Sequence, residues 1–190
     1  MPNIYVIAGP NGAGKSTMAQ TLLSPFLHCE EFVNADDIAR GLSAFRPEGV
    51  ALEAGRTMLR RLDDLAKRQA DFAFETTLAS RSFAPWLRKR QQEDFKFHLF
   101  FLWLPTAEVA IARVAARVAA GGHNIPEPDI RRRYERGIRN FFDIYSILAD
   151  TWEVYDTSSN RIALIASGRG DSNVEILNPD SWQKFNLSRA

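Results

Sequence analysis

Residues 9–16 constrain this chain more than any other segment. They read Gly-Pro-Asn-Gly-Ala-Gly-Lys-Ser, which is the G-x-x-x-x-G-K-[ST] spacing of a P-loop, and they directly follow the apolar run from Ile4 to Ala8. A buried strand that leads into a glycine-rich turn and then into a helix lets successive backbone N–H groups surround a phosphate. The segment therefore predicts a strand, loop and helix unit that binds a nucleoside triphosphate.

The expected role of each P-loop residue follows from its chemistry. The glycines allow backbone angles and close contacts that a Cβ would prevent. Lys15 reaches the β- and γ-phosphates, and Ser16 is the expected metal ligand, because its hydroxyl can be placed on Mg²⁺. The residues expected to bind the nucleotide here are Gly9, Pro10, Asn11, Gly12, Ala13, Gly14, Lys15, Ser16 and Thr17.

The composition excludes several classes of protein. The chain has 190 residues, of which 45% are hydrophobic, and its formal net charge is +1. This size favours a single core, and the small net charge gives no general field that would attract nucleic acid or an anionic membrane. Because neither an N-terminal leader nor an apolar run of membrane-spanning length is seen, we expect a cytoplasmic protein with no nucleic-acid or membrane partner.

Strand-like and helix-like segments alternate along the chain, which is typical of a three-layer α/β fold with a parallel sheet of five or six strands. The predicted strands are residues 3–8, 31–34, 71–75, 96–104, 152–156 and 161–166. The predicted helices are residues 15–23, 47–68, 83–93, 106–120 and 126–149. We expect one domain over residues 1–170, with a helical lid over residues 121–137 and a polar surface extension over residues 171–190.

Two carboxylates follow predicted strands, at the rim where open α/β sheets bind ligands. Asp36 follows the strand at 31–34, and Glu75 ends the strand at 71–75. A small-molecule kinase needs one carboxylate to take the proton of the acceptor hydroxyl and oxygen ligands for Mg²⁺ beside Ser16, and these two residues can divide the tasks. We assign the chemistry to Asp36 and the N-cap of a short helix at residues 38–42 to Asp37.

Arginines flank the glycine- and proline-rich loop at residues 121–127 on both sides. The helix from residue 126 has apolar residues at spacings of three and four, which predicts one buried face. If the loop closes over the cleft, the arginines can neutralise the charge of the transferred phosphoryl group, whereas an open loop would leave them as a solvated face. The arginines in question are Arg113, Arg117, Arg131, Arg132, Arg133 and Arg136, with Arg113 and Arg133 expected among the nucleotide contacts.

Four ordered motifs resemble those of the zeta-toxin-like P-loop kinases, in the short bacterial branch once described as predicted ABC-type ATPases. They are the P-loop at residues 9–17, Asn-Ala-Asp at 34–36, Glu-Thr-Thr-Leu at 75–78, and Gly-Gly-His-x-Ile-Pro-Glu-x-x-Ile-x-Arg-Arg-Tyr at 121–134. The ABC transporter and GTPase classes are excluded, because the chain lacks a Leu-Ser-Gly-Gly-Gln-like signature, a strand ending in Asp-Glu and an Asn-Lys-x-Asp motif.

The resemblance implies an ATP- and Mg²⁺-dependent kinase with the core of the nucleoside monophosphate kinases and the strand order 2-3-1-4-5. It implies that Lys15 holds phosphates, that Asp36 is the base for the acceptor hydroxyl, and that Glu75 and Thr77 line the acceptor pocket. Arg117, with Arg132 or Arg133, would be the lid arginines on ATP.

Well-known zeta toxins phosphorylate the sugar of UDP-N-acetylglucosamine and are held inactive by an antitoxin. The implied partners are therefore a small-molecule hydroxyl acceptor and an antitoxin protein. The chain departs from these toxins in its shorter length, in Glu-Thr-Thr where they have Glu-Gly-Thr, and in Asp156-Thr157-Ser158 where Asp-Asn-Ser is expected. Because of these departures the substrate itself does not transfer.

The leading hypothesis is a kinase for a hydroxyl of a nucleotide-sugar or other nucleotide-like metabolite, with a toxin as one biological setting. The alternative is an ATP-binding switch that regulates a protein partner without phosphorylating a metabolite. A nucleic-acid patch at the arginines is disfavoured by the small net charge. We expect His98 to be structural and His123 to fix the lid loop through a hydrogen bond.

Overall fold

The central strand of the sheet is β1 (Asn3–Ala8), which precedes the P-loop. The computed structural model describes residues 1–122, 124–159 and 161–189. In it, β1 pairs in parallel with β3 (Phe72–Thr76) and β4 (Lys96–Trp103). β2 (Phe32–Val33) and β5 (Thr151–Asp156) extend the sheet in parallel, which gives the order β2-β3-β1-β4-β5. This core confirms the fold and the strand order that the resemblance implied.

Two further strands make the sheet seven-stranded rather than about five-stranded. β6 (Ala163–Arg169) pairs antiparallel to β5, and β7 (Ser172–Ile176) pairs antiparallel to β6. The prediction of a wholly parallel sheet was therefore wrong at this edge. The physical reason is the connection: only residues 157–162 join β5 to β6, whereas a parallel crossover needs about a dozen residues or more.

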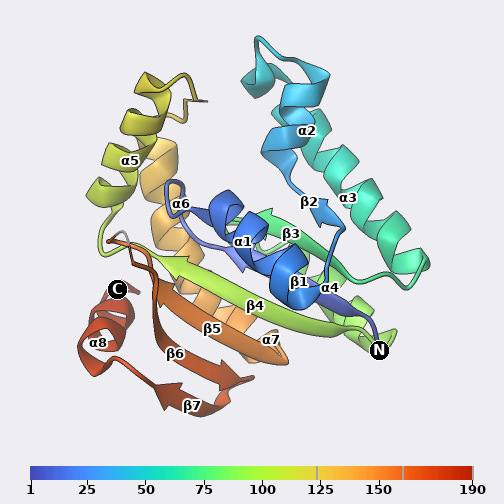
Figure 1. Ribbon diagram of the computed structural model, residues 1–190, viewed down its shortest axis with the longest axis vertical. Coiled ribbons are helices and arrows are strands. Elements are labelled where there is room, and N and C mark those ends of the chain that lie inside the picture. Colours follow the sequence, from blue (N-terminus) through green and yellow to red (C-terminus); the bar gives the residue numbers. More distant parts are fainter. Residues whose placement is uncertain (123, 160, 190) are drawn as a thin grey trace.

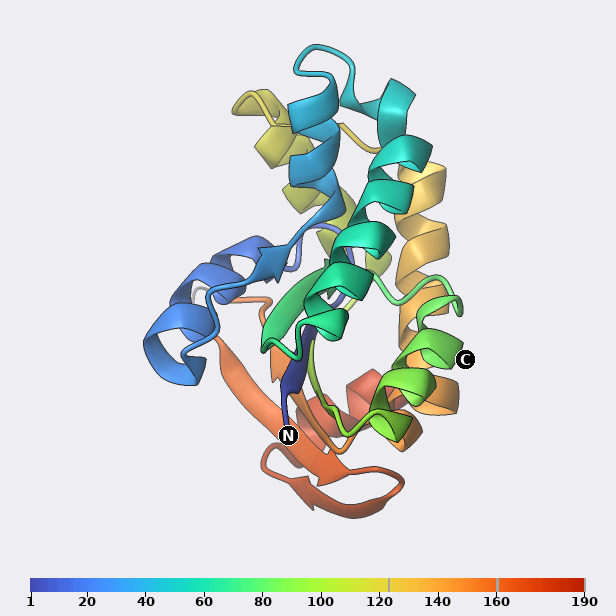
Figure 2. The ribbon, with the colours of Figure 1, turned by 90° about the vertical axis from the view of Figure 1, so that its right-hand side faces the viewer.

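Helices lie on both faces of the sheet and complete the three layers (Figures 1 and 2). α1 lies on one face, and α4, α6 and α8 lie on the other, as Figure 2 shows from the side. The helices are α1 (Lys15–Leu27), α2 (Ala35–Leu42), the 3₁₀ turn η1 (Pro47–Val50), α3 (Ala51–Lys67), α4 (Phe83–Gln92), α5 (Ala107–Ala119), α6 (Glu127–Asn140), the π-helical segment η2 (Phe141–Tyr145), α7 (Ser146–Leu148) and α8 (Pro179–Leu187).

Aromatic side chains build the core on the face that α4 and α8 cover. Successive strand residues point to opposite faces, so Phe72 and Phe74 of β3 both point to α4, where each ring packs on Trp86. On β4, Phe101 packs against Phe141 and Phe185. On this face, the sheet that carries the P-loop thus packs against several large rings.

The C-terminal segment, expected to be a polar surface extension over residues 171–190, contains β7 and α8 in the structure. β7 is exposed along its whole length, but Phe185 of α8 is fully buried. Its ring packs against Trp103, Phe101 and Phe141. The expectation of a surface segment was therefore wrong for α8. Its two large rings, Phe185 and the half-buried Trp182, stand in an otherwise polar stretch and give a weak sequence signal.

The helix predicted over residues 126–149 is divided into α6, the π-helical segment η2 and α7. Its expected apolar face is buried at Ile130, Tyr134, Ile138, Phe141 and Tyr145. The helix predicted over residues 47–68 begins as the 3₁₀ turn η1 before α3. Within the described residues, no helix combines the length and the apolar character that crossing a membrane requires.

Candidate active site

The P-loop leaves the carboxyl end of β1 and enters α1 in the conformation that its glycines predicted. Gly9 has a φ of 138°, and a Cβ at this position would lie 2.3 Å from the carbonyl oxygen of Leu102 on β4. Only glycine fits so close to the neighbouring strand. Gly14 also has a positive φ and stands at the N-terminus of α1, so that the first free N–H groups of the helix face the loop.

Lys15 is buried inside the loop, with only 6% of its surface exposed. Its ammonium group donates a hydrogen bond to the carbonyl oxygen of Pro10 over 3.0 Å, and Nζ lies 3.7 Å from Glu75 Oε1. Burial lowers the pKa of Lys15, while the charges of Glu75 and Asp36 act against that change. The site therefore holds a cation in a partly desolvated position, which a phosphate anion would stabilise.

Glu75, at the end of β3, is the acidic partner of the P-loop. Its Oε2 accepts a hydrogen bond from Ser16 Oγ over 2.7 Å and another from Asn34 Nδ2 over 3.1 Å. Two tasks were predicted for Asp36 and Glu75: taking the proton of the acceptor hydroxyl, and binding Mg²⁺ beside Ser16. The position of Glu75 favours the second task for this residue. The serine hydroxyl and the carboxylate together form an oxygen donor set of the kind that Mg²⁺ takes alongside nucleotide phosphates.

Asp36 lies in the first turn of α2, across the site from the P-loop, and its side chain is exposed. Its charge acts on Lys15, which places it near the phosphate end of the loop. The assignment of the N-cap to Asp37 was wrong: Asn34 caps α2 by accepting the N–H of Asp36 over 2.8 Å, and Asp37 pairs with Arg40 on the surface. The helix begins earlier than predicted, at Ala35, so the cap falls on the earlier residue.

The loop after β3 carries Thr77, the other residue expected in the acceptor pocket. This loop is fixed from below by α6 and η2, because Asn140 Nδ2 donates to the carbonyl of Leu78 over 2.7 Å and Tyr145 donates to the carbonyl of Ser80 over 2.7 Å. Sequence reasoning missed Asn140, which is buried although it lies off the predicted apolar stripe, so the spacing of apolar residues gave no signal for it.

The predicted arginines take different positions. Arg113 of α5 donates to the carbonyls of Gly12 in the P-loop, over 3.4 Å, and of Ser158, over 2.9 Å. Arg117 lies close enough for its charge to act on Lys15. Both residues of α5 thus border the P-loop, and their contact with the nucleotide stays a prediction.

The arginines of α6 point elsewhere in this structure. Arg132 pairs with Asp129 over 2.7 Å, and Arg131 joins Glu127 and Glu108, linking α6 to α5. The hydrogen bond from Arg131 lowers the pKa of Glu108 to about 2. Arg133 is half-buried on the same helix. His123, whose expected role was to fix the lid loop, lies outside the described residues.

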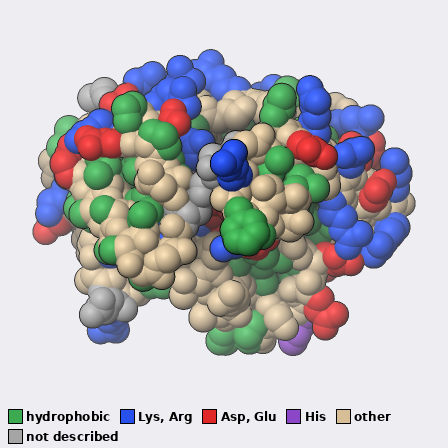
Figure 3. Space-filling model, turned by 90° about the horizontal axis from the view of Figure 1, so that it is seen from above, with side chains coloured by type: hydrophobic (Ala, Val, Ile, Leu, Met, Phe, Trp, Pro, Cys, Tyr) green, Lys and Arg blue, Asp and Glu red, His purple; other side chains and the backbone are tan. Residues whose placement is uncertain are grey.

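The surface above the site carries charges of both signs. In the view from above Figure 1, Lys and Arg side chains gather along the upper edge and the right-hand side, with acidic side chains between them (Figure 3). This mixture differs from the continuous basic surface typical of nucleic-acid binding.

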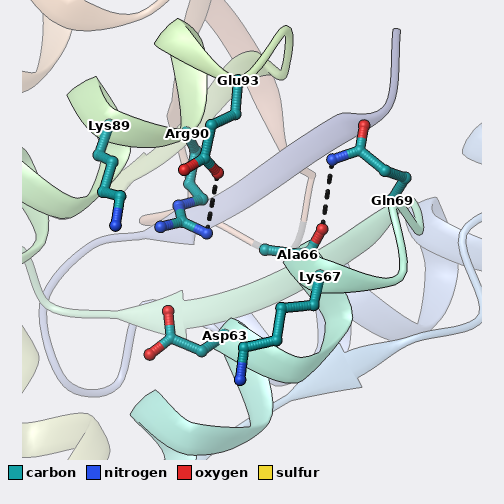
Figure 4. A pocket seen from close by; sticks show the side chains of 7 residues that line it. All are labelled: Asp63, Ala66, Lys67, Gln69, Lys89, Arg90 and Glu93. Carbon is teal, nitrogen blue, oxygen red and sulfur yellow. Dashed lines mark hydrogen bonds and ion pairs between the residues drawn. The ribbon is translucent and has the colours of Figure 1, made fainter.

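A separate pocket of about 360 Å³ lies between α3 and α4. Its lining residues pair with one another: Arg90 with Glu93 over 3.0 Å, and Gln69 with the carbonyl of Ala66 (Figure 4). Asp63 accepts the indole N–H of Trp86. The pocket contains none of the residues of the four motifs.

The sequence matches a known protein family over most of its length. Residues 4–136 match the AAA_33 family, an AAA domain. Among curated relatives, the cytidylate kinase of Haloarcula marismortui is 28% identical over 171 residues, which cover 83% of this chain and 80% of that protein.

Two solved structures share the fold. A chain in the crystal structure of the AvrRxo1-ORF1:-ORF2 complex with ATP superposes with a TM-score of 0.78 at 15% sequence identity. The match covers 100% of this chain and 65% of the AvrRxo1 chain, so this chain spans about two thirds of the length of that neighbour. A structure from the PezAT chromosomal toxin–antitoxin system of Streptococcus pneumoniae gives a TM-score of 0.65 at 11% identity over 98% and 84% of the two chains. At such low identities they show the fold alone, and this is the fold that the resemblance to zeta-toxin-like kinases implied. The chain therefore belongs to the AAA_33 family of AAA domains and has the P-loop kinase fold that its four motifs predicted.

Proposed function

We propose that this protein is an ATP-dependent phosphotransferase that acts on a hydroxyl of a small nucleotide-like or nucleotide-sugar metabolite. The observation that carries the proposal is the convergence of Lys15, Ser16 and Glu75 at the ends of β1 and β3. Asp36, in the first turn of α2, acts on Lys15 of this cluster through its charge. A P-loop alone predicts only nucleotide binding, whereas a second carboxylate across from it provides for an acceptor.

The donor half of the site is the P-loop. Its backbone N–H groups and Lys15 bind the phosphates of ATP and hold the γ-phosphoryl group in place. Ser16 and Glu75 would hold Mg²⁺, which neutralises phosphate charge when it is bound. Arg117, beside Lys15, adds positive charge where negative charge spreads during transfer.

The acceptor half is Asp36. As the acceptor oxygen bonds to the γ-phosphorus, its hydroxyl proton passes to the Asp36 carboxylate, and the bond from the γ-phosphorus to the bridging oxygen breaks, leaving ADP with the electron pair. Asp36 is exposed and therefore accessible to a substrate. Arg132 would have to exchange Asp129 for phosphate oxygens if it serves as a lid arginine.

The nucleotide-like acceptor class is supported by two independent likenesses. The cytidylate kinase relative acts, by its name, on a nucleotide, and the four motifs resemble zeta toxins that act on a nucleotide sugar. The toxin setting and an antitoxin partner are proposed on the shared fold with the PezAT system.

A metabolite panel incubated with purified protein, Mg²⁺ and ATP labelled at the γ-phosphate tests the proposal. We expect a labelled nucleotide-like product, lost in Lys15→Ala and reduced by 100-fold or more, on the order of a general base's contribution, in Asp36→Asn. Asp37→Asn is the matched control, since Asp37 neighbours Asp36 on α2 and pairs with Arg40 on the surface. The proposal fails if ATP is bound but no acceptor becomes labelled, which would favour the regulatory switch instead.

Growth after expression tests the toxin setting separately. We expect arrest with the wild-type chain and normal growth with Asp36→Asn. Normal growth with both would remove the toxin label and leave the kinase reaction standing.

A further inference from the structure

Asn34 is a buried amide that touches both halves of the proposed site. Only 7% of its surface is exposed. Its Nδ2 donates to Glu75 Oε2 over 3.1 Å, while its Oδ1 accepts the backbone N–H of Asp36 over 2.8 Å. These two partners fix the orientation of the amide, because a carboxylate can only accept and a backbone N–H can only donate.

We propose that Asn34 is a positioning residue that holds the Glu75 carboxylate toward the P-loop and, with the same side chain, sets the turn of α2 that carries Asp36. This inference rests on the proposed function, because it gives Asn34 the task of holding the donor and acceptor halves of the site at the correct distance from each other. Nothing in its position requires Asn34 to touch the substrate.

The residue type matches this task. Among short side chains, an amide can donate to a carboxylate and cap a helix at the same time. Serine also caps helices well, but its one hydroxyl is shorter and cannot replace both contacts. Asparagine at this position therefore does more than the cap requires.

Asn34 also provides the contact to Glu75 that does not depend on the P-loop. Glu75 Oε2 accepts from Ser16 as well as from Asn34, and Ser16 is the residue expected to turn its oxygen to Mg²⁺. When Ser16 is so engaged, the contact from Asn34 keeps the carboxylate aimed at the same place. Hydrogen-bond partners behind a metal ligand commonly change metal affinity or activity by about 10–100-fold when they are removed.

The test compares Asn34→Ser with Asn178→Ser. Asn178 caps α8 by accepting the N–H of Ser181 over 3.1 Å, so the same substitution there changes a helix cap outside the candidate site. Three quantities are measured for each variant: the thermal midpoint, the affinity for ATP with and without Mg²⁺, and kcat and KM for a labelled acceptor.

For Asn34→Ser we expect a thermal midpoint close to that of Asn178→Ser, because each keeps a capping residue. Affinity for ATP without Mg²⁺ should change less than about 3-fold, while the tightening of ATP binding by Mg²⁺ and kcat should each fall by about 10-fold. Asn34→Ala, which loses the cap as well, should show the same loss in Mg²⁺ dependence together with a lower thermal midpoint.

The proposal is overturned if Asn34→Ser matches Asn178→Ser in kcat and in its response to Mg²⁺. It is also overturned if Asn34→Ser weakens ATP binding equally with and without Mg²⁺ and lowers the thermal midpoint, since that describes a structural role only. If the wild-type chain labels no acceptor, the proposed function fails, and the response of ATP binding to Mg²⁺ still decides the role of Asn34.

Discussion

Gly137 of α6 lies directly against the backbone of Thr77: a Cβ on Gly137 would come within 2.4 Å of the Thr77 carbonyl oxygen. The absence of a side chain at this one position lets α6, which carries the arginines predicted for a lid, contact the loop that follows Glu75. Asn140, one turn further along, reinforces this contact through the carbonyl of Leu78. Helix α6 and the expected acceptor loop are therefore packed against each other.

Gly137→Ala should destabilise the protein by about 1–3 kcal/mol, because the rigid carbonyl must move to make room for the Cβ. The displaced loop should also raise the KM for the acceptor more than the KM for ATP. Urea denaturation and steady-state kinetics check these outcomes.

Gly55→Ala in α3 is the matched control for that change. No atom outside its own helix neighbours lies within 4 Å of the position a Cβ would occupy there. Alanine should stabilise this helix by about 0.5–1 kcal/mol. Equal effects of the two substitutions would contradict the packing argument.

Glu75→Gln should reduce kcat by 100-fold or more, since it removes the negative charge that stands beside Ser16 and Lys15. The fold should persist, because the amide keeps the shape of the side chain. The labelled-ATP assay measures the effect.

Glu31→Gln serves as the comparison for Glu75→Gln. Glu31 precedes β2 and pairs with Arg61 and Arg68 at the surface. Because surface ion pairs contribute little to stability, the loss of this charge should leave the fold intact and kcat within about 2-fold of the wild type. If Glu75→Gln is equally mild, the carboxylate has no place beside the reaction.

Phe185→Ala should destabilise the protein by about 3–5 kcal/mol, the usual cost of removing a buried aromatic ring. Leu187→Ala, two residues later but 69% exposed, should change stability by less than about 0.5 kcal/mol. Thermal or urea unfolding of both variants measures the difference. A small effect at Phe185 would mean that α8 is not part of the cooperative core.

Stability should decrease on acidification below about pH 6.5 because of His98. Burial lowers the pKa of His98 from 6.5, and the positive charge of Lys96 acts in the same direction. The negative charges of Asp150, Asp71 and Glu153 oppose this change but do not cancel it. As the pH falls, the imidazole is protonated in the unfolded chain at a higher pH than in the folded chain. The contribution of neutral His98 to the free energy of unfolding is therefore complete above pH 6.5 and declines as the pH falls toward the lowered pKa.

His98→Gln removes the titrating group and keeps a polar side chain between Thr151 and Asn3, which are hydrogen-bond partners of the imidazole. The loss of unfolding free energy between pH 7.5 and 5.5 should be smaller in this variant, by up to about 1.4 kcal/mol per pH unit within the window. An unchanged pH dependence would assign the effect to other groups. The two contacts confirm that His98 is structural, as its place in a strand predicted.

Local patterns in the sequence were sufficient for the P-loop, the parallel core strands and the buried face of α6. Each of these depends on neighbours in the chain: a glycine spacing, an apolar run, or a repeat of three and four residues. The order of the strands did not come from local patterns: the resemblance to zeta-toxin-like kinases implied it, and the pairing of β1 with β3 and β4 confirms it. The cap of α2 was misassigned to Asp37 because Asn34, Asp36 and Asp37 are all residue types that cap helices, so local signal does not separate them.

The sequence by itself determined that this chain has a P-loop, an α/β core and carboxylates at the rim of the sheet. Only the tertiary structure decided which carboxylate meets the P-loop. Ser16 and Glu75 are 59 positions apart, and their 2.7 Å contact exists because β1 and β3 lie side by side in parallel and end at the same edge. The antiparallel β6 and β7, the buried Phe185 and the bridge through Asn34 likewise depend on contacts between distant residues, which no local pattern encodes.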